Sequence, residues 1–344
     1  MSERRLRIAL AGDGDEARAW ASVLRAHADL RPLPEELPDE LDAVVLAAGA
    51  HDPFSRAKEA LQAGLPVLYS APFLLNPWQA ARLSLLAGRQ RRLLRFVEPF
   101  QHRLGFPFLQ RLLQGREPFW RPLYLRLLCL AGSDDQLRID ELATEQLALC
   151  DVLLNDEPRH VTAAAVRSDD AGDVCAAFLT LQYEGGTMVQ CTISLAEAEA
   201  GRQLVVVAPG RTVVLDDFDA VASVRVAGSE HDAVESGGGA APHGAGSHKL
   251  VAQGGADPVE EEAKGFLEAV ASGSLASANG ERWARVAALW WAARQSMSFD
   301  GPVEVPPALF QLRSTEPPPL KVIEGGGKTV RTARPRPSLT VVNG

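Results

Sequence analysis

The amino-acid sequence predicts an α/β protein in which a parallel sheet is followed by a large, mostly antiparallel open sheet in an α+β domain. Over residues 1–120, short apolar runs alternate with helical stretches, which is typical of a parallel sheet covered by helices. Over residues 121–305, strand-like runs follow one another with turn residues between them, which indicates an antiparallel or mixed sheet. A chain of 344 residues is long enough to bury two such cores.

The first domain begins with an apolar run, a glycine-containing turn and a helical stretch. We expect its strands at residues 6–11, 41–48, 66–69 and 93–97, and its helices at 16–27, 53–63 and 76–92. Asn76 is a good N-cap for the last helix, and Pro77 suits its first position. Residues 30–34 are the only candidate second strand. Because the next strand begins at Leu41, the helix that usually follows the second strand is missing.

The second domain contains most of the strand-like runs. We expect its strands at residues 123–130, 161–167, 175–183, 187–194, 204–208, 212–216 and 221–226. A helix is expected at 139–154, and closing helices within 258–295 pack back with core tryptophans. Residues 236–256, rich in Gly, Ala, Ser and His, are expected to form a flexible loop, and 306–344 a poorly ordered, Pro-rich basic tail.

Composition and charge exclude several classes of protein. A net charge of −9 argues against nucleic-acid binding, which needs a basic face. No apolar run approaches the ~20 residues of a membrane helix. The four cysteines are widely spaced and lie in apolar segments, which predicts a reduced, cytoplasmic protein. Acidic residues near the 139–154 helix (Asp134, Asp135, Asp140 and Glu141) show no ligand spacing, so no metal site is predicted.

Gly12, Gly14 and Ala17 form a G-x-G-x-x-A pattern between a strand and a helix. In this context the glycines allow a tight turn and a close approach to a pyrophosphate, which the helix N-terminus attracts. The pattern therefore predicts a Rossmann-type dinucleotide site. A tight turn that binds nothing is the alternative.

The adenosine end of this site is reduced in the sequence. A dinucleotide site usually has an acidic residue at the end of its second strand to bind the ribose hydroxyls. Glu35 and Glu36 are the only acids near that point. Because acids repel a 2′-phosphate, they give a slight preference for NAD over NADP.

The order of the segments resembles the Gfo/Idh/MocA family, the relatives of glucose–fructose oxidoreductase and inositol dehydrogenase, over residues 5–305. Ala60-Leu-Gln-Ala-Gly64 followed by Pro66-Val-Leu matches a family motif, and Ser70-Ala71-Pro72 stands where the family has Glu-Lys-Pro. Phe100-Gln-His-Arg103 with Pro107 resembles its "R-x-x-P" helix start. Residues 141–158 overlie the helix that carries "G-x-H-D", and residues 210–216 and 257–305 resemble the final sheet and helices.

This resemblance implies NAD(P)-dependent oxidation or reduction of a sugar, cyclitol or related small molecule, and a homodimer or higher homo-oligomer formed through the C-terminal sheet. It also implies that a lysine and a histidine surround the reacting carbon, but the matching positions here are Ala71 and Glu145. Glu145 is either a base whose pKa is raised by burial or a helix-surface carboxylate.

Other polar residues follow strands at the edge where parallel sheets bind ligands. His102 and Tyr69 are further candidates for proton transfer, although a solvated histidine and a packed tyrosine are the simpler interpretations. Ala48, His51 and Ser70 are candidates for contact with the cofactor. Three hypotheses stay open: a divergent NAD(P)-dependent oxidoreductase, a catalytically degenerate binding or scaffold subunit, and a non-redox enzyme that keeps the cofactor.

Overall fold

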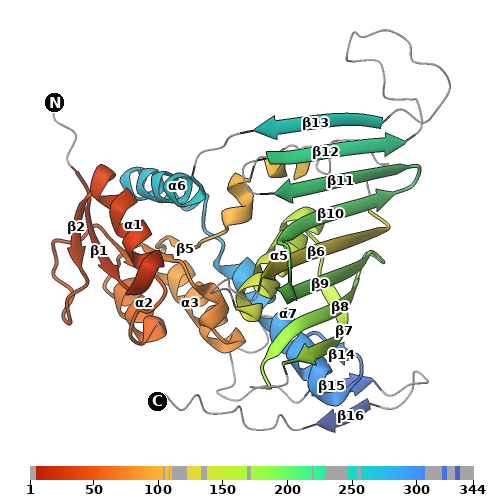
Figure 1. The fold of residues 1–344 in the computed structure, drawn as a ribbon. Helices are drawn as coiled ribbons and strands as arrows, with labels where there is room; N and C mark the ends of the chain where they lie inside the picture. Colours follow the sequence, from red (N-terminus) through yellow and green to blue (C-terminus); the bar gives the residue numbers. More distant parts are fainter. Residues whose placement is uncertain are drawn as a thin grey trace.

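Two β-sheets form the framework of the protein, with helices packed on and between them (Figure 1). The computed structural model describes residues 5–103, 105–107, 109–110, 122–132, 138–168, 172–218, 221–228, 247–253, 257–306, 320–323 and 330–333. Among these residues, no helix is long and apolar enough to cross a membrane.

The first sheet is parallel, as the alternating pattern predicts. Its strand order is β2-β1-β3-β4-β5. The strands are β1 (Arg7–Ala11), β2 (Asp29–Pro32), β3 (Ala43–Leu46), β4 (Val67–Tyr69) and β5 (Leu94–Phe96). The helices between them are α1 (Gly14–His27), α2 (Pro53–Gln62) and α3 (Pro77–Gln90). Residues 33–42 lead from β2 to β3 without a helix, which confirms the missing crossover helix.

Local sequence signals set the boundaries of these elements. The β3 strand is fully buried and consists of Ala, Val, Val and Leu, the composition of a strand covered on both faces. At the start of α3, Asn76 and Gln79 form a reciprocal capping box, so Asn76 is the cap that the sequence predicts. The strands end along one edge of the sheet, where the glycine turn also lies.

The second sheet has the order β13-β12-β11-β10-β6-β9-β8-β7-β14-β15-β16, and all neighbouring strands are antiparallel except the parallel pair β6 and β9. The strands are β6 (Tyr124–Gly132), β7 (Pro158–Arg167), β8 (Val174–Tyr183), β9 (Met188–Glu197), β10 (Gly201–Ala208), β11 (Arg211–Phe218), β12 (Val221–Gly228), β13 (Ser247–Gln253), β14 (Val303–Glu304), β15 (Leu320–Ile323) and β16 (Val330–Ala333). The mostly antiparallel open sheet predicted from the sequence is therefore present.

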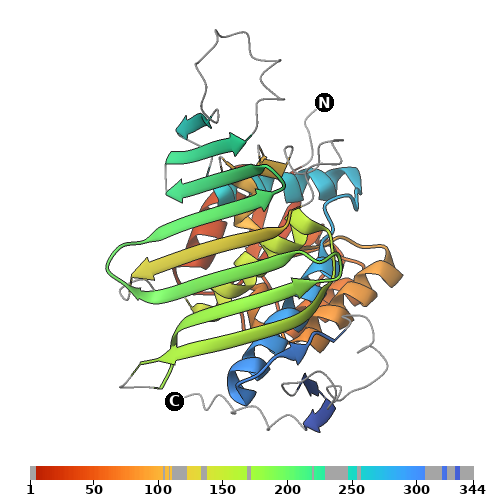
Figure 2. The ribbon, with the colours of Figure 1, turned by 90° about the vertical axis from the view of Figure 1, so that its right-hand side faces the viewer.

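Helices cover one face of this sheet. The α5 helix (Ile139–Leu154) and the α7 helix (Gly280–Phe299) pack between the two sheets, and α7 also contacts α3. Trp283 and Trp290 of α7 are buried, as expected. The α6 helix (Pro258–Ser272) packs on α1. Figure 2 shows the opposite face of the large sheet, over which no described element passes.

Two expectations are corrected here. The flexible loop predicted over 236–256 includes a strand, β13, paired with β12. The tail predicted over 306–344 includes β15 and β16, which extend the sheet beyond β14. Composition concealed these strands because edge strands gain their hydrogen bonds from a neighbouring backbone and need little apolar patterning. The other parts of these two segments, apart from Pro306, lie outside the described residues.

Candidate functional site

The glycine turn lies at the carboxyl edge of the first sheet, between β1 and α1. Gly12 has a φ of +140°, and a Cβ there would come within 2.8 Å of both the Ala47 Cβ and the Ala48 carbonyl oxygen. Gly14 has a φ of +75°, with open space where a Cβ would project. Asp13, the N-cap of α1, makes no side-chain capping hydrogen bond. The turn therefore combines a close strand approach with an open helix N-terminus, the geometry that binds phosphates.

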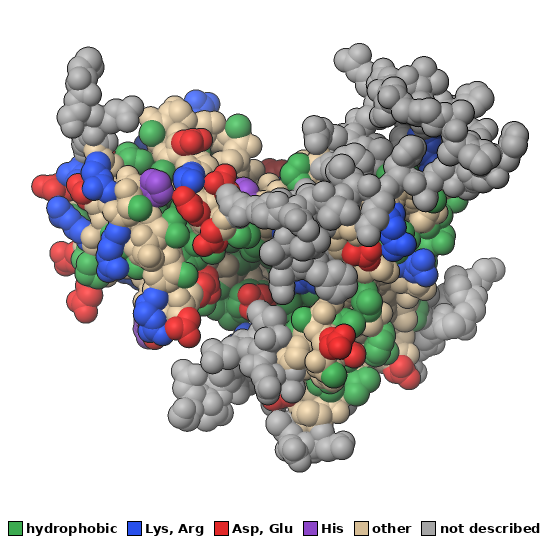
Figure 3. Space-filling view, turned by 45° about the horizontal axis from the view of Figure 1, so that its top comes forward, with side chains coloured by type: hydrophobic (Ala, Val, Ile, Leu, Met, Phe, Trp, Pro, Cys, Tyr) green, Lys and Arg blue, Asp and Glu red, His purple; other side chains and the backbone are tan. Residues whose placement is uncertain are grey.

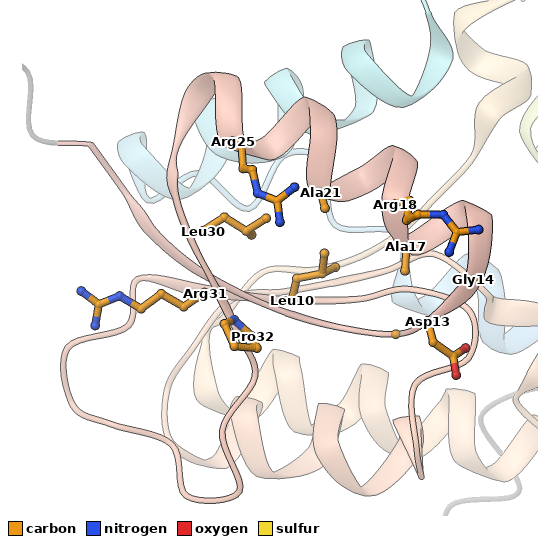
Figure 4. Close-up of a pocket in the computed structure, with 11 residues that line it drawn as sticks. Leu10, Asp13, Gly14, Ala17, Arg18, Ala21, Arg25, Leu30, Arg31 and Pro32 are labelled. Atoms are coloured by element: carbon orange, nitrogen blue, oxygen red, sulfur yellow. The ribbon is translucent and has the colours of Figure 1, made fainter.

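A pocket of about 660 Å³ opens from this turn toward β2 (Figure 4). Its volume lies within the ~300–1,000 Å³ of small-molecule sites. The lining residues come from the end of β1, the glycine turn, one side of α1 and the edge strand β2: Leu10, Gly12, Asp13, Gly14, Ala17, Arg18, Ala21, Arg25, Leu30, Arg31 and Pro32. Gly12, Gly14 and Ala17 thus share one pocket, and it lies on the side of the turn where a Rossmann fold binds adenosine.

Carboxylates gather on the other side of the turn, toward β4. The Ser70 hydroxyl, just beyond β4, donates a hydrogen bond to Glu16 in the first turn of α1. The pKa of Glu141 in α5 is raised to about 7, mainly by burial and also by the nearby negative charges of Glu16 and Glu145. Arg138 and Arg202 oppose this rise. Figure 3 shows acidic side chains along the hollow between the two halves of the molecule.

Glu145 lies one helical turn after Glu141 and is held by guanidinium groups. Arg103 Nη2 donates to Glu145 Oε1 at 2.5 Å, and Arg202 Nη2 lies 3.8 Å from Oε2. The Glu145 side chain is only 12% exposed, so the helix-surface interpretation is wrong. The two guanidinium groups hold its carboxylate in a fixed position, which suits a residue that orients a ligand.

Ala71, at the position of the family lysine, is buried and offers no charge. It caps the short helix η1 (Pro72–Leu74), which packs against α5. The α5 carboxylates therefore lie close to the end of β4.

Tyr69 and His102 lie in other surroundings. Tyr69 is in the core, with its ring centroid 5.5 Å from that of Phe96 in a tilted contact, and burial raises its pKa above the ordinary value. His102 Nε2 lies 3.2 Å from Glu262 Oε1 of α6, a carboxylate that is 1% exposed and also pairs with Arg95. In the described part of the chain, neither residue forms a hydrogen bond or ion pair with Glu141 or Glu145 of α5.

The remaining predicted cofactor contacts also have defined positions. The Ala48 carbonyl oxygen accepts a hydrogen bond from Asp13 N at 3.2 Å, so it supports the glycine turn. His51 is exposed before α2. Glu35 does not line the pocket, and its carbonyl oxygen accepts a hydrogen bond from Arg56 of α2 at 2.9 Å. The end of β2 is instead occupied by Arg31 and Pro32.

The residues of this site fit a dinucleotide, with one unfavourable feature. The turn, the pocket and the exposed N-terminus of α1 suit an adenosine diphosphate group. Asp13, Asp15 and Glu16 place negative charge beside the pyrophosphate position, although Arg18 pairs with Asp15 and Ser70 donates to Glu16. Among the described residues no group of His, Cys, Asp and Glu side chains could hold a metal ion.

Glu141 is the functional candidate that the sequence interpretation missed. Its acidic neighbours in the sequence suggested only a solvated loop. The available signal was its spacing: Glu141 and Glu145 are four residues apart in a predicted helix, so they share one face.

No protein-family model matches the chain, and no curated protein sequence matches it. Solved structures do. UDP-N-acetylglucosamine 3-dehydrogenase GnnA from Acidithiobacillus ferrooxidans is 20% identical over 86% of this chain and 98% of that chain, with a TM-score of 0.70. Levoglucosan dehydrogenase in complex with NADH is 13% identical over 88% of this chain and 100% of that chain, with a TM-score of 0.71.

A third similar structure is KijD10, a 3-ketoreductase from Actinomadura kijaniata, in complex with NADP. It is 17% identical over 85% of this chain and 98% of that chain, with a TM-score of 0.65. These structures are NAD(P)-dependent sugar dehydrogenases and ketoreductases of the Gfo/Idh/MocA type. The chain therefore has the Gfo/Idh/MocA fold, which confirms at the level of the fold the resemblance found in the sequence.

Proposed function

We propose that the protein is an NAD(P)-dependent oxidoreductase that interconverts a hydroxyl and a carbonyl group on a sugar, a cyclitol or a related polar small molecule. One observation carries the proposal: along a single sheet edge, the glycine turn separates a nucleotide-sized pocket at β2 from a carboxylate cluster near β4. This order matches a dinucleotide laid across the edge, with its reactive end at the cluster. The catalytic activities of the structural neighbours support the same class of reaction.

Glu141 is the proton-transfer residue in this proposal. A bound nicotinamide supplies the electron acceptor or donor, and the hydroxyl proton must then move to or from a protein group. With a pKa of about 7, Glu141 can accept that proton as a carboxylate and return it as an acid near neutral pH. The chain thus has its own acid–base group although the lysine and histidine positions are Ala71 and Glu145.

Glu145 and its arginines orient the substrate. Arg103 and Arg202 hold the Glu145 carboxylate in place. Its oxygens can accept hydrogen bonds, and the guanidinium groups can donate them, in a fixed arrangement that suits the vicinal hydroxyl groups of a sugar or cyclitol. The neighbouring negative charge also keeps Glu141 protonated to a higher pH.

The test is a substrate panel under both cofactors. Purified protein is incubated with NAD⁺ or NADP⁺ and with aldoses, cyclitols, anhydrosugars and UDP- or TDP-linked sugars, and reduced nicotinamide is followed by absorbance. The last two classes are included because the structural neighbours comprise a levoglucosan dehydrogenase, a UDP-N-acetylglucosamine 3-dehydrogenase and a 3-ketoreductase bound to TDP-benzene. The proposal predicts stoichiometric reduction with at least one member.

The two alternative hypotheses give different results. A non-redox enzyme would bind cofactor and convert substrate with no net change in reduced nicotinamide, as product analysis would show. A degenerate scaffold subunit would give no turnover, and the buried, uncharged Ala71 is the observation that favours it. Absence of binding by either cofactor at millimolar concentration would refute the proposal.

A further inference from the structure

The pocket beside β2 has an excess of positive charge. Arg18, Arg25 and Arg31 line it, against the single carboxylate of Asp13. In Figure 4, Arg25 extends from α1 over the floor formed by Leu10 and Leu30, whereas Arg31 projects outward from the edge strand, on the side away from the glycine turn. These positive charges would attract a phosphate group strongly, but they would add little to the binding of a neutral ribose.

Two of these arginines are available to a ligand. Arg18 forms an ion pair with Asp15. Within the described part of the chain, no hydrogen bond or ion pair engages the guanidinium groups of Arg25 and Arg31, and both residues are exposed. Guanidinium groups bind phosphate through paired N–H donors, and they repel one another until an anion is bound.

The end of β2 lacks the acceptor that an unphosphorylated ribose requires. NAD sites place an Asp or Glu there to bind the ribose hydroxyls, and NADP sites use a nearby arginine for the 2′-phosphate. Here β2 ends with Arg31 and Pro32, while Glu35 does not line the pocket and lies in a segment attached to Arg56. The slight preference for NAD drawn from Glu35 and Glu36 thus has no counterpart in the pocket.

We propose that this pocket selects NADP(H) over NAD(H), with Arg31 as the residue that discriminates the 2′-phosphate and Arg25 as its supporting cation. The inference rests on the proposed function and specifies its cofactor. It also accounts for the acidic turn: because Asp13, Asp15 and Glu16 weaken pyrophosphate binding, an additional phosphate at the arginine end supplies the missing attraction.

The experiment measures dissociation constants by titration of the full-length protein with NADPH and NADH, followed by nicotinamide fluorescence. Adenosine 2′,5′-bisphosphate and 5′-AMP are titrated by calorimetry as probes of the pocket alone. We expect NADPH and the bisphosphate to bind at least ~10-fold more tightly than their unphosphorylated counterparts, and added salt to reduce this difference.

Variants assign the effect to residues. Arg31→Ala should weaken NADPH binding about 10-fold and change NADH binding less than about 2-fold, and Arg25→Ala should weaken NADPH binding by roughly 3-fold. Arg31→Asp should reverse the preference, because its carboxylate can accept from the ribose hydroxyls. Arg89→Ala, an exposed arginine of α3 outside the pocket, is the matched control and should change neither constant.

Each other outcome has a definite meaning. Equal or tighter binding of NADH by the unaltered protein would overturn the cofactor inference and leave the oxidoreductase proposal standing. An NADPH preference that survives in both Arg31→Ala and Arg31→Asp would overturn the assignment to Arg31. If neither dinucleotide binds, the proposed function fails, and the inference fails with it.

Discussion

At the scale of single residues, the chemistry depends on Glu141. Glu141→Gln removes the exchangeable proton but keeps the size of the side chain, so we expect turnover to fall roughly 10²- to 10⁴-fold. Cofactor affinity should stay nearly unchanged, because no pocket residue is altered. Glu268→Gln, an exposed glutamate of α6, is the control and should keep full activity. Undiminished turnover in Glu141→Gln would assign proton transfer elsewhere.

The pH dependence of turnover is a separate prediction. Oxidation requires the Glu141 carboxylate to accept a proton, so kcat/KM in this direction should fall as the pH drops below the Glu141 pKa of about 7. Reduction requires the acid form and should decline above the same pH. Initial rates across the pH range, at saturating cofactor, test both limbs. If the residual activity of Glu141→Gln showed the same pH dependence in both directions, Glu141 would be excluded as its origin.

The raised pKa of Glu141 should also make the free energy of unfolding depend on pH. The native pKa of Glu141 is about 7 against an ordinary 4.5, so between these values the native state binds more protons than the unfolded state. The free energy of unfolding therefore decreases as the pH rises through this window. Glu141→Gln has no carboxylate at this position and does not show this decrease. The difference between its melting temperature and that of the wild type should therefore rise by on the order of 2–4 °C between about pH 5 and about pH 8. A constant difference would contradict the raised pKa.

At the scale of elements, Asn279 closes the edge of the first sheet. Its side chain accepts from Phe96 N at 2.7 Å and donates to Phe96 O at 2.8 Å, on the side of β5 that faces away from β4. Asn279→Ala would leave both buried backbone groups unpaired, at a cost of about 2–5 kcal/mol in the free energy of unfolding. Urea unfolding measures this cost.

Asn76→Ala is the reference variant with which the loss of stability in Asn279→Ala is compared. It removes the exposed cap of α3, which is worth about 1 kcal/mol. Equal losses in Asn279→Ala and Asn76→Ala would show that β5 does not depend on this link.

The elements that could be predicted from the sequence are those in which burial sets the spacing of apolar residues along the chain. The alternation in the first sheet and helix α5 follows this rule, as does the missing crossover helix after β2. The β13, β15 and β16 strands could not be predicted, because their pairing comes from neighbours distant in sequence. The same limit applies to the site: local spacing reveals Gly12, Gly14 and Ala17, but only folding brings Glu16 near Glu141 and ties His102 to Glu262.

At the scale of the whole molecule, α7 connects the two sheets. Arg282 donates to Glu98 beyond β5 at 2.8 Å and lies 3.4 Å from Asp151 of α5, which Arg285 also binds through two hydrogen bonds of 2.9 Å. Glu98 is 1% exposed, and its burial raises its pKa, while Arg282 opposes this. These paired charges hold α5 beside the first sheet, which is what places Glu141 and Glu145 near the nucleotide edge.

We propose that the protein associates through the open face of the large sheet as a homodimer, one of the assemblies (homodimer or higher homo-oligomer) that the family resemblance implies. Phe178, Val166, Met188 and Tyr124 are 46%, 50%, 37% and 39% exposed on neighbouring strands. Large apolar side chains exposed on one face of a sheet favour association, and a stable interface needs about 1,600 Å² in total. We expect light scattering to give twice the chain mass of 36.9 kDa. Phe178→Glu should give the monomer mass with an unchanged circular dichroism spectrum, because a charge on each copy would be desolvated in a self-complementary contact. A monomeric wild type, or a Phe178→Glu variant that still pairs, would place any assembly on another surface.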